Sequence, residues 1–541
     1  MMFAHRFAPL SIVFSLWLAA CGAAPEVGLA GDALGNNEDG KKQNGPRLTV
    51  DAAWDNGANV HDLAGNLIWA RVERLYDHED RLFTQEDFLD VTAWHADDVY
   101  APHIQEMFGS DMPHSHFALL HYGLTWNQAT QPVPVLIIPG AGDNASRSAV
   151  LAISDLRHRG YSCFSLTFAH SQGDNYQQAQ QIANAVARIR EVTGAAQVDI
   201  IAHSKGATAT SIYLSNQAGR NWGTGGDVRG TAYTKYGTRF AGDVRRFIEL
   251  GGANLGVDTT YRWTAANYMW AFGNGMNAPS SWVTYYPSTT TAWWFAESLA
   301  DQDFFDDGFD AFPGQRQLLN DWSSTYLLPG ANAMLGAYAL QQDWYTTYYG
   351  GYGFMSYSRG LESARVAGGK LIDKLNNFGL APSVEVAIAI GNHPIIPTGT
   401  EATDTTYGAM LDSLIDLGQA GLTNFLGTFT WLAAYDSCEV QAMLTSEMLL
   451  GEVSGPSDGV VFIESATATA GLLKNGAKLL EIKELPLSHV DYLMAVPAMV
   501  PILRAQAAAN PESCWKNSFA DRIEQADLFG WLDSTLKASS N

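Results

Sequence analysis

Short, mainly apolar runs alternate with amphipathic stretches between residues 133 and 255 of the chain. Each run has the length and composition of a strand buried on both faces, and the stretches between the runs carry apolar side chains every three or four positions. The runs are Val133–Ile138, Tyr161–Phe168, Val198–Ala202 and Arg246–Leu250, and the amphipathic stretches are Ser148–Arg159 and Tyr176–Val192. Strands that alternate with helices form βαβ units, so the pattern predicts an α/β protein with a mostly parallel sheet.

The alternation stops after residue 255 and resumes with a further predicted strand at Val384–Ile390. In between, residues 256–380 hold 26 Phe, Trp and Tyr in 125 positions, about twice the 11% of the whole chain. We interpret this segment as an aromatic-rich helical insertion within one catalytic domain. Its aromatic side chains either fill a core of the insertion itself or line a cap or lid over an apolar substrate, and the two interpretations are compatible.

Residues 48–128 mix helical stretches with His and Trp and carry no motif that we can assign. We expect them to pack as an N-terminal extension on the domain that follows. The predicted organisation is a signal peptide (1–20), a tether (21–47), this extension (48–128), the first half of the core (129–255), the insertion (256–380), and the second half of the core with a C-terminal helix (381–541).

The N-terminus has the features of a secretory signal peptide, because one cation, Arg6, precedes the apolar run Phe7–Leu18. The run ends in residues 18–21 (LAAC), which resemble the lipobox of bacterial lipoproteins. That resemblance implies that Cys21 is acylated and becomes the mature N-terminus; an ordinary signal peptide with a chance cysteine is the alternative. Residues 22–47 hold few large apolar side chains and are predicted to be a tether. We therefore expect the bacterial cell envelope, with the protein either lipid-anchored at the outer membrane or secreted.

The composition narrows the range of partners. The chain of 541 residues carries a net charge of −24, and 47% of its residues are apolar, so it can bury a large core. A protein that binds nucleic acid through phosphates needs a concentrated basic surface, which argues against nucleic acid as a partner of this acidic chain. The partners that we expect are a lipid or other ester substrate and, through the anchor, a membrane; a monomer is compatible with the sequence.

Three cysteines remain once Cys21 is set aside, and an oxidising envelope allows one disulfide among them. Cys163 lies in an apolar run that is predicted to be a buried strand. This favours a disulfide between Cys438 and Cys514, although the sequence leaves the other pairings open.

A sharp turn between a strand and a helix carries the candidate nucleophile. Residues 202–206 (AHSKG) end the strand Val198–Ala202 and precede a predicted helix at Ala207–Leu214. Small residues on both sides of Ser204 let the backbone turn sharply, and the helix N-terminus below the serine stabilises negative charge. The same pattern recurs at residues 169–173 (AHSQG), but no helix begins directly after Ser171, so Ser204 is favoured.

Residues 198–206 (VDIIAHSKG), together with 248–254 (IELGGAN) and the loop 139–142 (PGAG), resemble the bacterial secreted lipases of class 2 and the related family I lipases. The resemblance implies an α/β-hydrolase fold and hydrolysis of carboxylic esters. It also implies that the backbone N–H groups of Ala141 and Lys205 form the oxyanion hole. Lys205 departs from the residue usual in these lipases, which leaves acyl-chain and head-group preference open.

The order serine, acid, histidine in this fold points to two loops beyond the insertion. Residues 455–461 (GPSDGVV) and 487–491 (LSHVD) match the Asp-Gly turn and the His-x-Asp turn of the family, so Asp458 is the predicted acid and His489 the predicted base. Asp458 would orient the imidazole, and His489 would take the proton from Ser204 and return it to the leaving alcohol. His393 is a rival base, but no acid-bearing turn precedes it in the expected order.

The larger family I lipases carry a calcium ion, and the resemblance implies a site for one here. Asp491, two residues after His489, matches one ligand, and Asp436, 22 residues before Asp458, matches a second carboxylate. Calcium prefers such oxygen ligands and would brace the loop of His489, whereas a solvated or salt-bridged pair of carboxylates is the alternative. No cofactor is required for the chemistry itself.

The sequence as a whole predicts a serine ester hydrolase. The favoured function is that of a triacylglycerol lipase acting through an acyl-enzyme at Ser204. A carboxylesterase for soluble esters or a polyester depolymerase is the first alternative, and a lipid-binding envelope protein with an inactive triad is the second.

Overall fold

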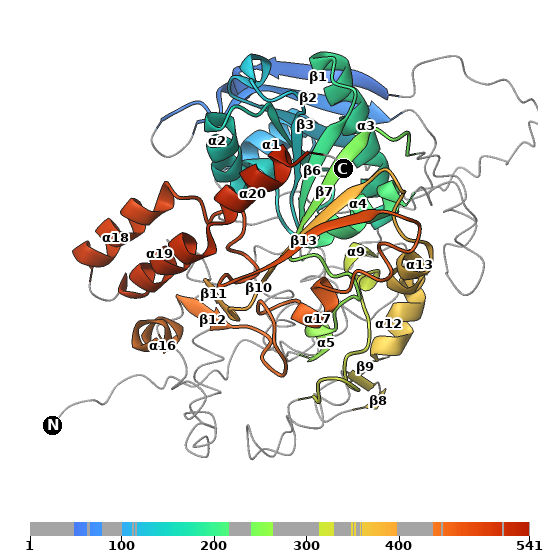
Figure 1. Ribbon diagram of the computed structural model, residues 1–541, viewed down its shortest axis with the longest axis vertical. Coiled ribbons are helices and arrows are strands. Elements are labelled where there is room, and N and C mark those ends of the chain that lie inside the picture. Colours follow the sequence, from blue (N-terminus) through green and yellow to red (C-terminus); the bar gives the residue numbers. More distant parts are fainter. Residues whose placement is uncertain are drawn as a thin grey trace, which may run out of the picture. The chain divides into compact units, whose positions relative to one another are not determined.

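Nine strands of the described residues form one sheet, which Figure 1 shows at the centre of the ribbon. The computed structural model describes residues 48–539, except for 62–64, 78–99, 111–112, 114–115, 172, 216–239, 263–312, 329–347, 350, 353–356, 359, 398–435, 445–446 and 511–512. The strands are β1 (Leu48–Asp55), β2 (Trp69–Asp77), β3 (Phe117–Gly123), β4 (Val135–Ile138), β5 (Cys163–Phe168), β6 (Val198–His203), β7 (Val244–Leu250), β10 (Glu385–Gly391) and β13 (Lys478–Leu485). They lie in the order β1-β2-β3-β5-β4-β6-β7-β10-β13.

The strand directions define the fold. All neighbours from β5 to β13 pair in parallel, whereas β3 runs opposite to the strands on both of its sides. The eight strands from β2 to β13 therefore have the order and directions of the α/β-hydrolase fold, and β1 adds one antiparallel strand at the edge. This confirms the predicted α/β class and the mostly parallel sheet.

The five predicted apolar runs all form strands of this sheet, as β4, β5, β6, β7 and β10. Every residue of β4, β5 and β10 is buried, because helices cover both faces of the sheet. The predicted amphipathic stretches form α2 (Val150–His158) and α3 (Asn175–Thr193). Burial along the whole strand explains why mainly apolar runs in the sequence predicted these strands.

The described parts of residues 48–128, where the sequence indicated an N-terminal extension with helical stretches, contain one such helix, at Ala101–Phe108, and also join the same sheet. They supply β1, β2 and β3. Charged side chains inside β2 concealed its strand character: Glu73 is fully buried, and it accepts hydrogen bonds from Arg188 Nε (2.8 Å) and Tyr122 Oη (2.6 Å). A carboxylate can lie in a core when such donors satisfy it, but its charge interrupts the apolar pattern.

Helices pack on both faces of the sheet. Buried side chains of α2 and α20 (Leu528–Lys537) belong to the core on one face, and those of α3 and α4 (Lys205–Leu214) belong to the core on the other. Figure 1 shows the two pairs on opposite sides of the strands. The remaining α-helices are α1 (Ala101–Phe108), α5 (Thr259–Arg262), α9 (Pro313–Arg316), α12 (Leu361–Ala367), α13 (Leu371–Phe378), α16 (Ser437–Leu444), α17 (Ile463–Ala466), α18 (Met499–Ala509) and α19 (Trp515–Ala526). Two small antiparallel pairs complete the strands, β8 (Gly351–Tyr352) with β9 (Tyr357–Ser358) and β11 (Ile395–Pro397) with β12 (Met448–Leu450).

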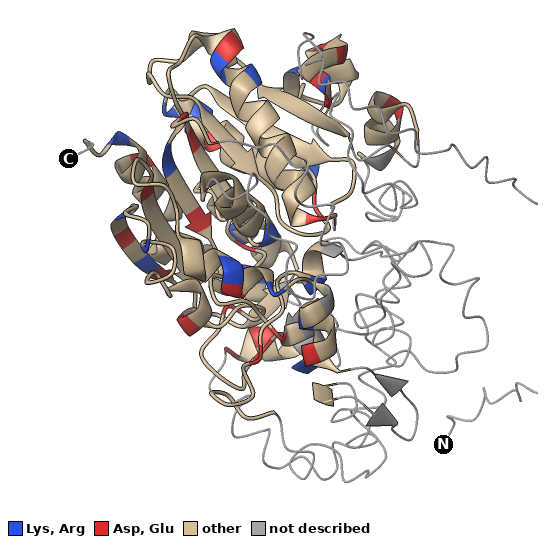
Figure 2. Cartoon of the chain, turned by 90° about the vertical axis from the view of Figure 1, so that its right-hand side faces the viewer, with Lys and Arg blue, Asp and Glu red and all other residues tan. Residues whose placement is uncertain are grey.

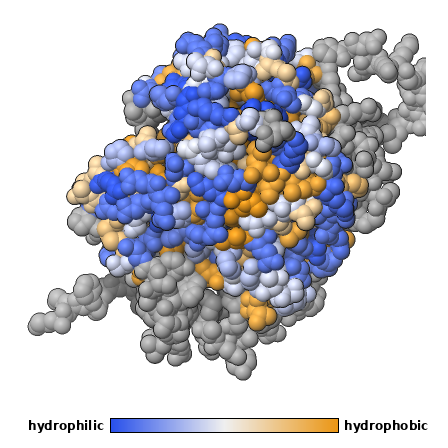
Figure 3. Space-filling view, in the orientation of Figure 1, coloured by the Kyte–Doolittle hydropathy of each residue, from blue (hydrophilic) through white to orange (hydrophobic). Residues whose placement is uncertain are grey.

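Strand β13 forms the other edge of the sheet. Leu479, Leu480 and Ile482 are each 37% exposed, and Figure 3 shows an apolar area on the face that this strand crosses. Charged residues alternate with them at positions 478, 481, 483 and 484. Charges on an edge strand discourage pairing with another chain. Figure 2 shows that most of the residues drawn in it are uncharged, which agrees with the 16% of charged residues in the sequence.

Several sequence predictions fall on parts of the chain that the structure does not describe. The chain divides into Met1–Gly45 and Pro46–Asn541, and everything described belongs to the second unit. The predicted signal peptide with Cys21, the tether, and much of the insertion (263–312 and 329–347) lie outside the described residues. In the part that is described, no helix is long and apolar enough to cross a membrane.

The carboxyl group of Glu249, in β7, has no charged partner among the described residues. Glu249 is completely buried, and its Oε2 accepts a hydrogen bond from Asn254 Nδ2 (2.8 Å). Burial raises the pKa of Glu249 to about 8, so the group is mainly neutral at pH 7. Unfolding returns it to an ordinary pKa near 4.5. The folded state therefore holds a proton that the unfolded state releases between these two pH values.

We predict that Glu249→Gln removes this dependence on pH. The stability of the wild type falls relative to that of the variant as the pH rises from 5 to 8, by at most about 1.4 kcal/mol per pH unit. Denaturant unfolding at several pH values measures the difference. Glu191→Gln, at a side chain that is 69% exposed, serves as the control. Parallel pH curves for wild type and Glu249→Gln would contradict the prediction.

Candidate active site

The backbone of Ser204 has a strained conformation between β6 and α4. Its φ is 53° and its ψ is −126°, values that a residue with a side chain rarely adopts. Such a turn lifts the serine hydroxyl above the end of the sheet, as a nucleophile elbow requires. Gly206 permits the turn, because a Cβ at this position would lie 2.5 Å from the carbonyl oxygen of Pro139.

The loop after β4 lies against the elbow. A Cβ on Gly140 would lie 3.0 Å from Ser204 Cβ, so glycine allows the two loops to touch. The predicted oxyanion donors are the backbone N–H groups of Ala141, which follows Gly140, and Lys205, which follows Ser204. The Lys205 side chain is buried, and its Nζ donates to Gln178 Oε1 at 2.5 Å. The ammonium group is thus engaged inside the fold. The predicted oxyanion donor of Lys205 is its backbone N–H group, not its side chain.

All four polar atoms of His489 are hydrogen-bonded. In the ring, Nε2 lies 2.8 Å from Ser204 Oγ, and Nδ1 lies 2.8 Å from Asp458 Oδ2. In the backbone, the N–H donates to the carbonyl of Asp458 (2.8 Å), and the carbonyl accepts from His203 Nε2 (2.8 Å). The structure therefore brings Ser204, His489 and Asp458 together in one chain of hydrogen bonds, with the imidazole held in a single orientation.

The Asp458 carboxylate is buried and accepts four hydrogen bonds. Oδ2 accepts from His489 Nδ1 and from Tyr492 Oη (2.9 Å), and Oδ1 accepts from the backbone N–H groups of Val460 (3.0 Å) and Val461 (2.8 Å). Donors that favour the charged form compensate for the burial of a carboxylate. An ionised, fixed Asp458 can stabilise the imidazolium that forms when His489 takes a proton.

The sequence did not indicate a role for two side chains that lie near the triad, His203 and Tyr492. Burial, with the neighbouring His489 as a second cause, lowers the pKa of His203 to about 3, so its ring is neutral, and its Nε2–H group holds the carbonyl of His489. Tyr492 donates to Asp458 and accepts from the backbone N–H of Gly391 (2.6 Å). Burial and the charge of Asp458 raise the pKa of Tyr492 well above 10, which keeps it a donor. No sequence signal identified Tyr492, because the contact joins two loops that meet only in the fold.

The two rivals lie in other environments. Ser171 is buried, its φ is not positive, and three residues, 172–174, separate it from the start of α3 at Asn175. The ring of His393 lies 3.4 Å from Glu439 Oε1, an ion-pair distance if the histidine is protonated. Neither has the hydrogen-bond geometry that Ser204 and His489 share.

The two predicted calcium ligands lie in different surroundings. Asp436 is exposed, and its Oδ1 accepts from the N–H of Cys438 (2.7 Å), at the start of α16. Asp491 is buried, its Oδ2 accepts from the N–H of Ser488 (2.8 Å), and Arg522 supplies positive charge nearby. No contact joins the two carboxylates, and within the described ranges no group of three His, Cys, Asp or Glu could hold a metal. Calcium stays a prediction, and no step below depends on it.

The cysteines are divided as the sequence favoured. Cys438, in α16, and Cys514, next to α19, form a disulfide. Cys163 is a buried free thiol in β5, and burial raises its pKa, so it is not a reactive nucleophile.

Comparison with known proteins adds to this geometry. Residues 132–276 match the lipase (class 2) family. That segment is similar to class 2 lipases. It holds the oxyanion loop, the elbow and β7, and the match supports a carboxylic ester hydrolase; Asp458 and His489 lie beyond it. A search of curated proteins finds no match.

Solved structures of lipases and esterases show a weak similarity. The mature lipase BlEst2 of Bacillus licheniformis is 13% identical over 69% of this chain and 94% of its own, with a TM-score of 0.28. The metagenomic carboxyl esterase MGS0156 is 12% identical over 67% of this chain and 65% of its own, with a TM-score of 0.28. We therefore assign the fold from the strand order and directions of this chain and not from these similarities.

The Tyr492 hydroxyl should support turnover rather than substrate binding. Tyr492→Phe removes one donor to Asp458 and keeps the ring. We predict that kcat for a soluble ester falls about three- to tenfold while KM is unchanged, because one hydrogen bond contributes about 0.5–1.5 kcal/mol. Steady-state kinetics with p-nitrophenyl acetate measure both constants.

Tyr213→Phe is the matched control for this prediction. Tyr213 is also buried, and its hydroxyl donates to a carboxylate, Asp243 Oδ1, at 2.5 Å. Tyr213→Phe also removes one buried hydrogen bond to a carboxylate, so its free energy of unfolding should fall by about as much as that of Tyr492→Phe. Its kcat should stay at the wild-type value. Equal kcat values for Tyr492→Phe and the wild type would show that the hydroxyl does not orient the acid.

Proposed function

We propose that the protein is a serine ester hydrolase that acts on lipid esters as a triacylglycerol lipase. The observation that carries the proposal is the chain of hydrogen bonds from Ser204 through His489 to Asp458, which starts at a strained strand–helix turn. The similarity of residues 132–276 to class 2 lipases supports the same reaction class. A merely structural serine has no need of this backbone conformation.

The proposed reaction has two halves. Ser204 Oγ attacks the ester carbonyl carbon while His489 Nε2 accepts its proton, and the N–H groups of Ala141 and Lys205 donate to the developing oxyanion. The bond to the alcohol oxygen then breaks, and the alcohol leaves with the proton from His489. Water attacks the acyl-enzyme in the same way, giving up a proton to His489. That proton returns to Ser204 Oγ as the carboxylic acid leaves.

The aromatic composition of residues 256–380 supports a lipid as the substrate. An apolar segment between the nucleophile and the acid is suited to contact with an acyl chain. Soluble esters and polyesters remain as outcomes of a substrate comparison. Hydrolysis that rises sharply when tributyrin passes from dissolved monomer to emulsion indicates a lipase, whereas equal rates on both sides of the solubility limit indicate an esterase.

Ser204→Ala tests the nucleophile directly. We predict that the variant loses ester hydrolysis by at least about 10⁴-fold and is no longer labelled by a fluorophosphonate probe. Ser171→Ala, which alters the second copy of the same sequence pattern, should be labelled like the wild type. Labelling is read by gel fluorescence and by the mass of the modified peptide. If the wild type is not labelled, the lipid-binding function without catalysis is favoured. If Ser204→Ala is labelled like the wild type, the nucleophile is a residue other than Ser204.

We further propose that the protein is anchored to the bacterial envelope through a lipid on Cys21. The proposal rests on the sequence of residues 1–21, in which a predicted signal peptide (1–20) is followed by Cys21, the last residue of LAAC. Acyl chains on the N-terminal cysteine would hold the protein at the membrane without a spanning helix.

Cys21→Ser tests the anchor. We predict that the wild type incorporates radiolabelled palmitate and sediments with membranes, whereas Cys21→Ser carries no label and is recovered in the soluble fraction. Cell fractionation followed by immunoblotting measures the distribution. A wild-type protein that is exported but unlabelled and soluble would identify residues 1–20 as an ordinary signal peptide.

A further inference from the structure

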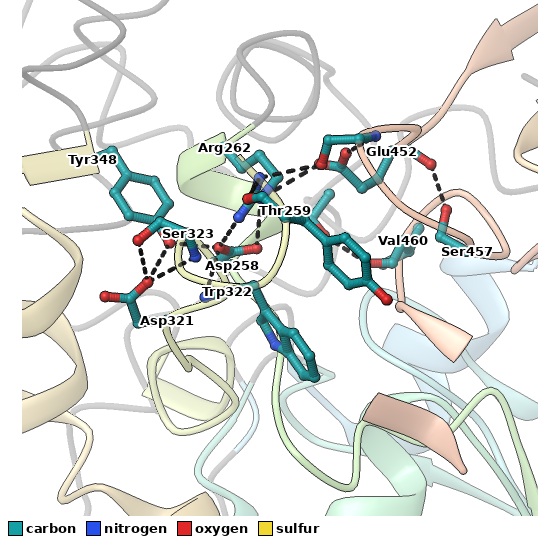
Figure 4. Close-up of polar contacts among 12 residues, drawn as sticks. Asp258, Thr259, Arg262, Asp321, Trp322, Ser323, Tyr348, Glu452, Ser457 and Val460 are labelled. Atoms are coloured by element: carbon teal, nitrogen blue, oxygen red, sulfur yellow. Dashed lines mark hydrogen bonds and ion pairs between the residues drawn. The ribbon is translucent and has the colours of Figure 1, made fainter. Parts of the chain in front are cut away.

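A buried ion pair stands at the start of the insertion that follows β7. Arg262 Nε and Nη2 donate to Asp258 Oδ1 (3.0 Å) and Oδ2 (2.8 Å), and both side chains are completely buried (Figure 4). A paired guanidinium and carboxylate of this geometry need further partners to compensate for lost hydration.

Those partners come from three segments that are distant in the sequence. Asp258 Oδ2 accepts from Tyr348 Oη (2.5 Å) and from the N–H of Trp322 (3.1 Å), as Figure 4 shows. Arg262 Nη1 donates to the carbonyl of Tyr326 (2.7 Å) and to Ser454 Oγ (3.1 Å). The pair therefore joins described parts of the insertion to the segment that carries Asp458.

That segment, residues 452–461, is itself closed by hydrogen bonds. Ser457 Oγ donates to the carbonyl of Glu452 and accepts from the N–H of Gly459 (3.0 Å). The N–H of Glu452 donates to the carbonyl of Gly459 (2.7 Å). Asp458 lies inside this closed loop, so contacts that fix the position of the loop also fix the position of the acid.

One peptide group connects α5 to the acid. Thr259 Oγ1 donates to the carbonyl oxygen of Val460 at 2.5 Å (Figure 4). The N–H at the other end of that same peptide, on Val461, donates to Asp458 Oδ1 at 2.8 Å. A peptide is planar, so holding its oxygen also fixes the direction of its N–H. A hydrogen bond at the carbonyl also polarises the peptide and strengthens the bond that its N–H donates.

We propose that Thr259 is a positioning residue for the Asp458 carboxylate, acting through the Val460–Val461 peptide and held in place by the Asp258–Arg262 pair. The inference rests on the proposed serine hydrolase function. It assigns the first turn of the insertion a part in catalysis besides any contact with substrate, because the same turn orients the acid of the triad. Thr259 touches neither Ser204 nor His489 in this arrangement, and its effect passes through Asp458.

The test compares Thr259→Val, which keeps the shape and removes the hydroxyl, with Thr259→Ser, which keeps the hydroxyl. We predict that kcat for p-nitrophenyl acetate falls about three- to tenfold in Thr259→Val with KM unchanged, and that Thr259→Ser restores most of the loss. Thr467→Val is the matched control. The hydroxyl of Thr467 also donates to a carbonyl, that of Ile463 (2.8 Å), but not on the path to Asp458.

A double-mutant cycle with Asp458→Asn separates positioning from a general loss of structure. If Thr259 acts through the carboxylate, Thr259→Val causes no further fall in kcat once Asp458 is replaced. If the loss is general, both backgrounds fall by the same factor. Thr259→Ala, which adds no methyl group next to the Val460 carbonyl, is measured in the same way if Thr259→Val does not fold.

The outcomes distinguish this inference from the proposed function. Ser204-dependent hydrolysis in the wild type with unchanged kcat in Thr259→Val overturns the positioning role alone. So does a loss in Thr259→Val that Thr259→Ser does not restore, or that Thr467→Val shares. A wild type without Ser204-dependent hydrolysis overturns both the proposed function and this inference.

Discussion

The strained backbone of Ser204 is the constraint on which the site depends. A positive φ at a residue with a side chain costs about 1–3 kcal/mol and persists only where the surroundings leave no alternative. Here the Ser204 N–H donates to the carbonyl of Leu250 (3.0 Å), at the end of β7, and α4 begins directly after the serine. The contact of Gly206 with Pro139 closes the turn from the other side. The sheet therefore holds the elbow rigidly, with the loop after β4 against it, and the serine hydroxyl reaches His489 in the loop that follows β13.

The histidine and the acid are placed differently, by loops that hold one another. His489 is bound through its backbone to Asp458 and His203 and through its ring to Asp458 and Ser204. The acid loop is bound in turn by Thr259 and Arg262, from a part of the chain that precedes it by about 200 residues. Loops without such contacts would leave the positions of His489 and Asp458 poorly defined. The mutual hydrogen bonds fix these two residues, as the sheet fixes Ser204.

How far the sequence could predict the molecule depended on the range of the interactions involved. The strands β4, β5, β6, β7 and β10 were evident because burial on both faces selects mainly apolar residues within one segment, even where a charged residue such as Glu249 is present. The candidate triad was found from the order and spacing of its motifs. Strand β2 was not found, because Glu73 places a charge in a buried position whose partner, Arg188, lies on α3. Tyr492 and Thr259 were not found for the same reason, since their hydroxyl groups are matched by acceptors in other loops.

The sequence by itself determined the elements whose cause is local: apolar strands, amphipathic helices, a turn of small residues around a serine, and the loops that carry Asp458 and His489. Only the tertiary structure decided which buried polar groups satisfy one another. It bound Tyr492 to Asp458 and attached the first turn of the insertion to the acid loop. The physical reason is that hydrophobic burial is encoded by composition along one segment. A buried hydrogen bond instead needs two groups within about 3 Å, and only the folded chain sets that distance.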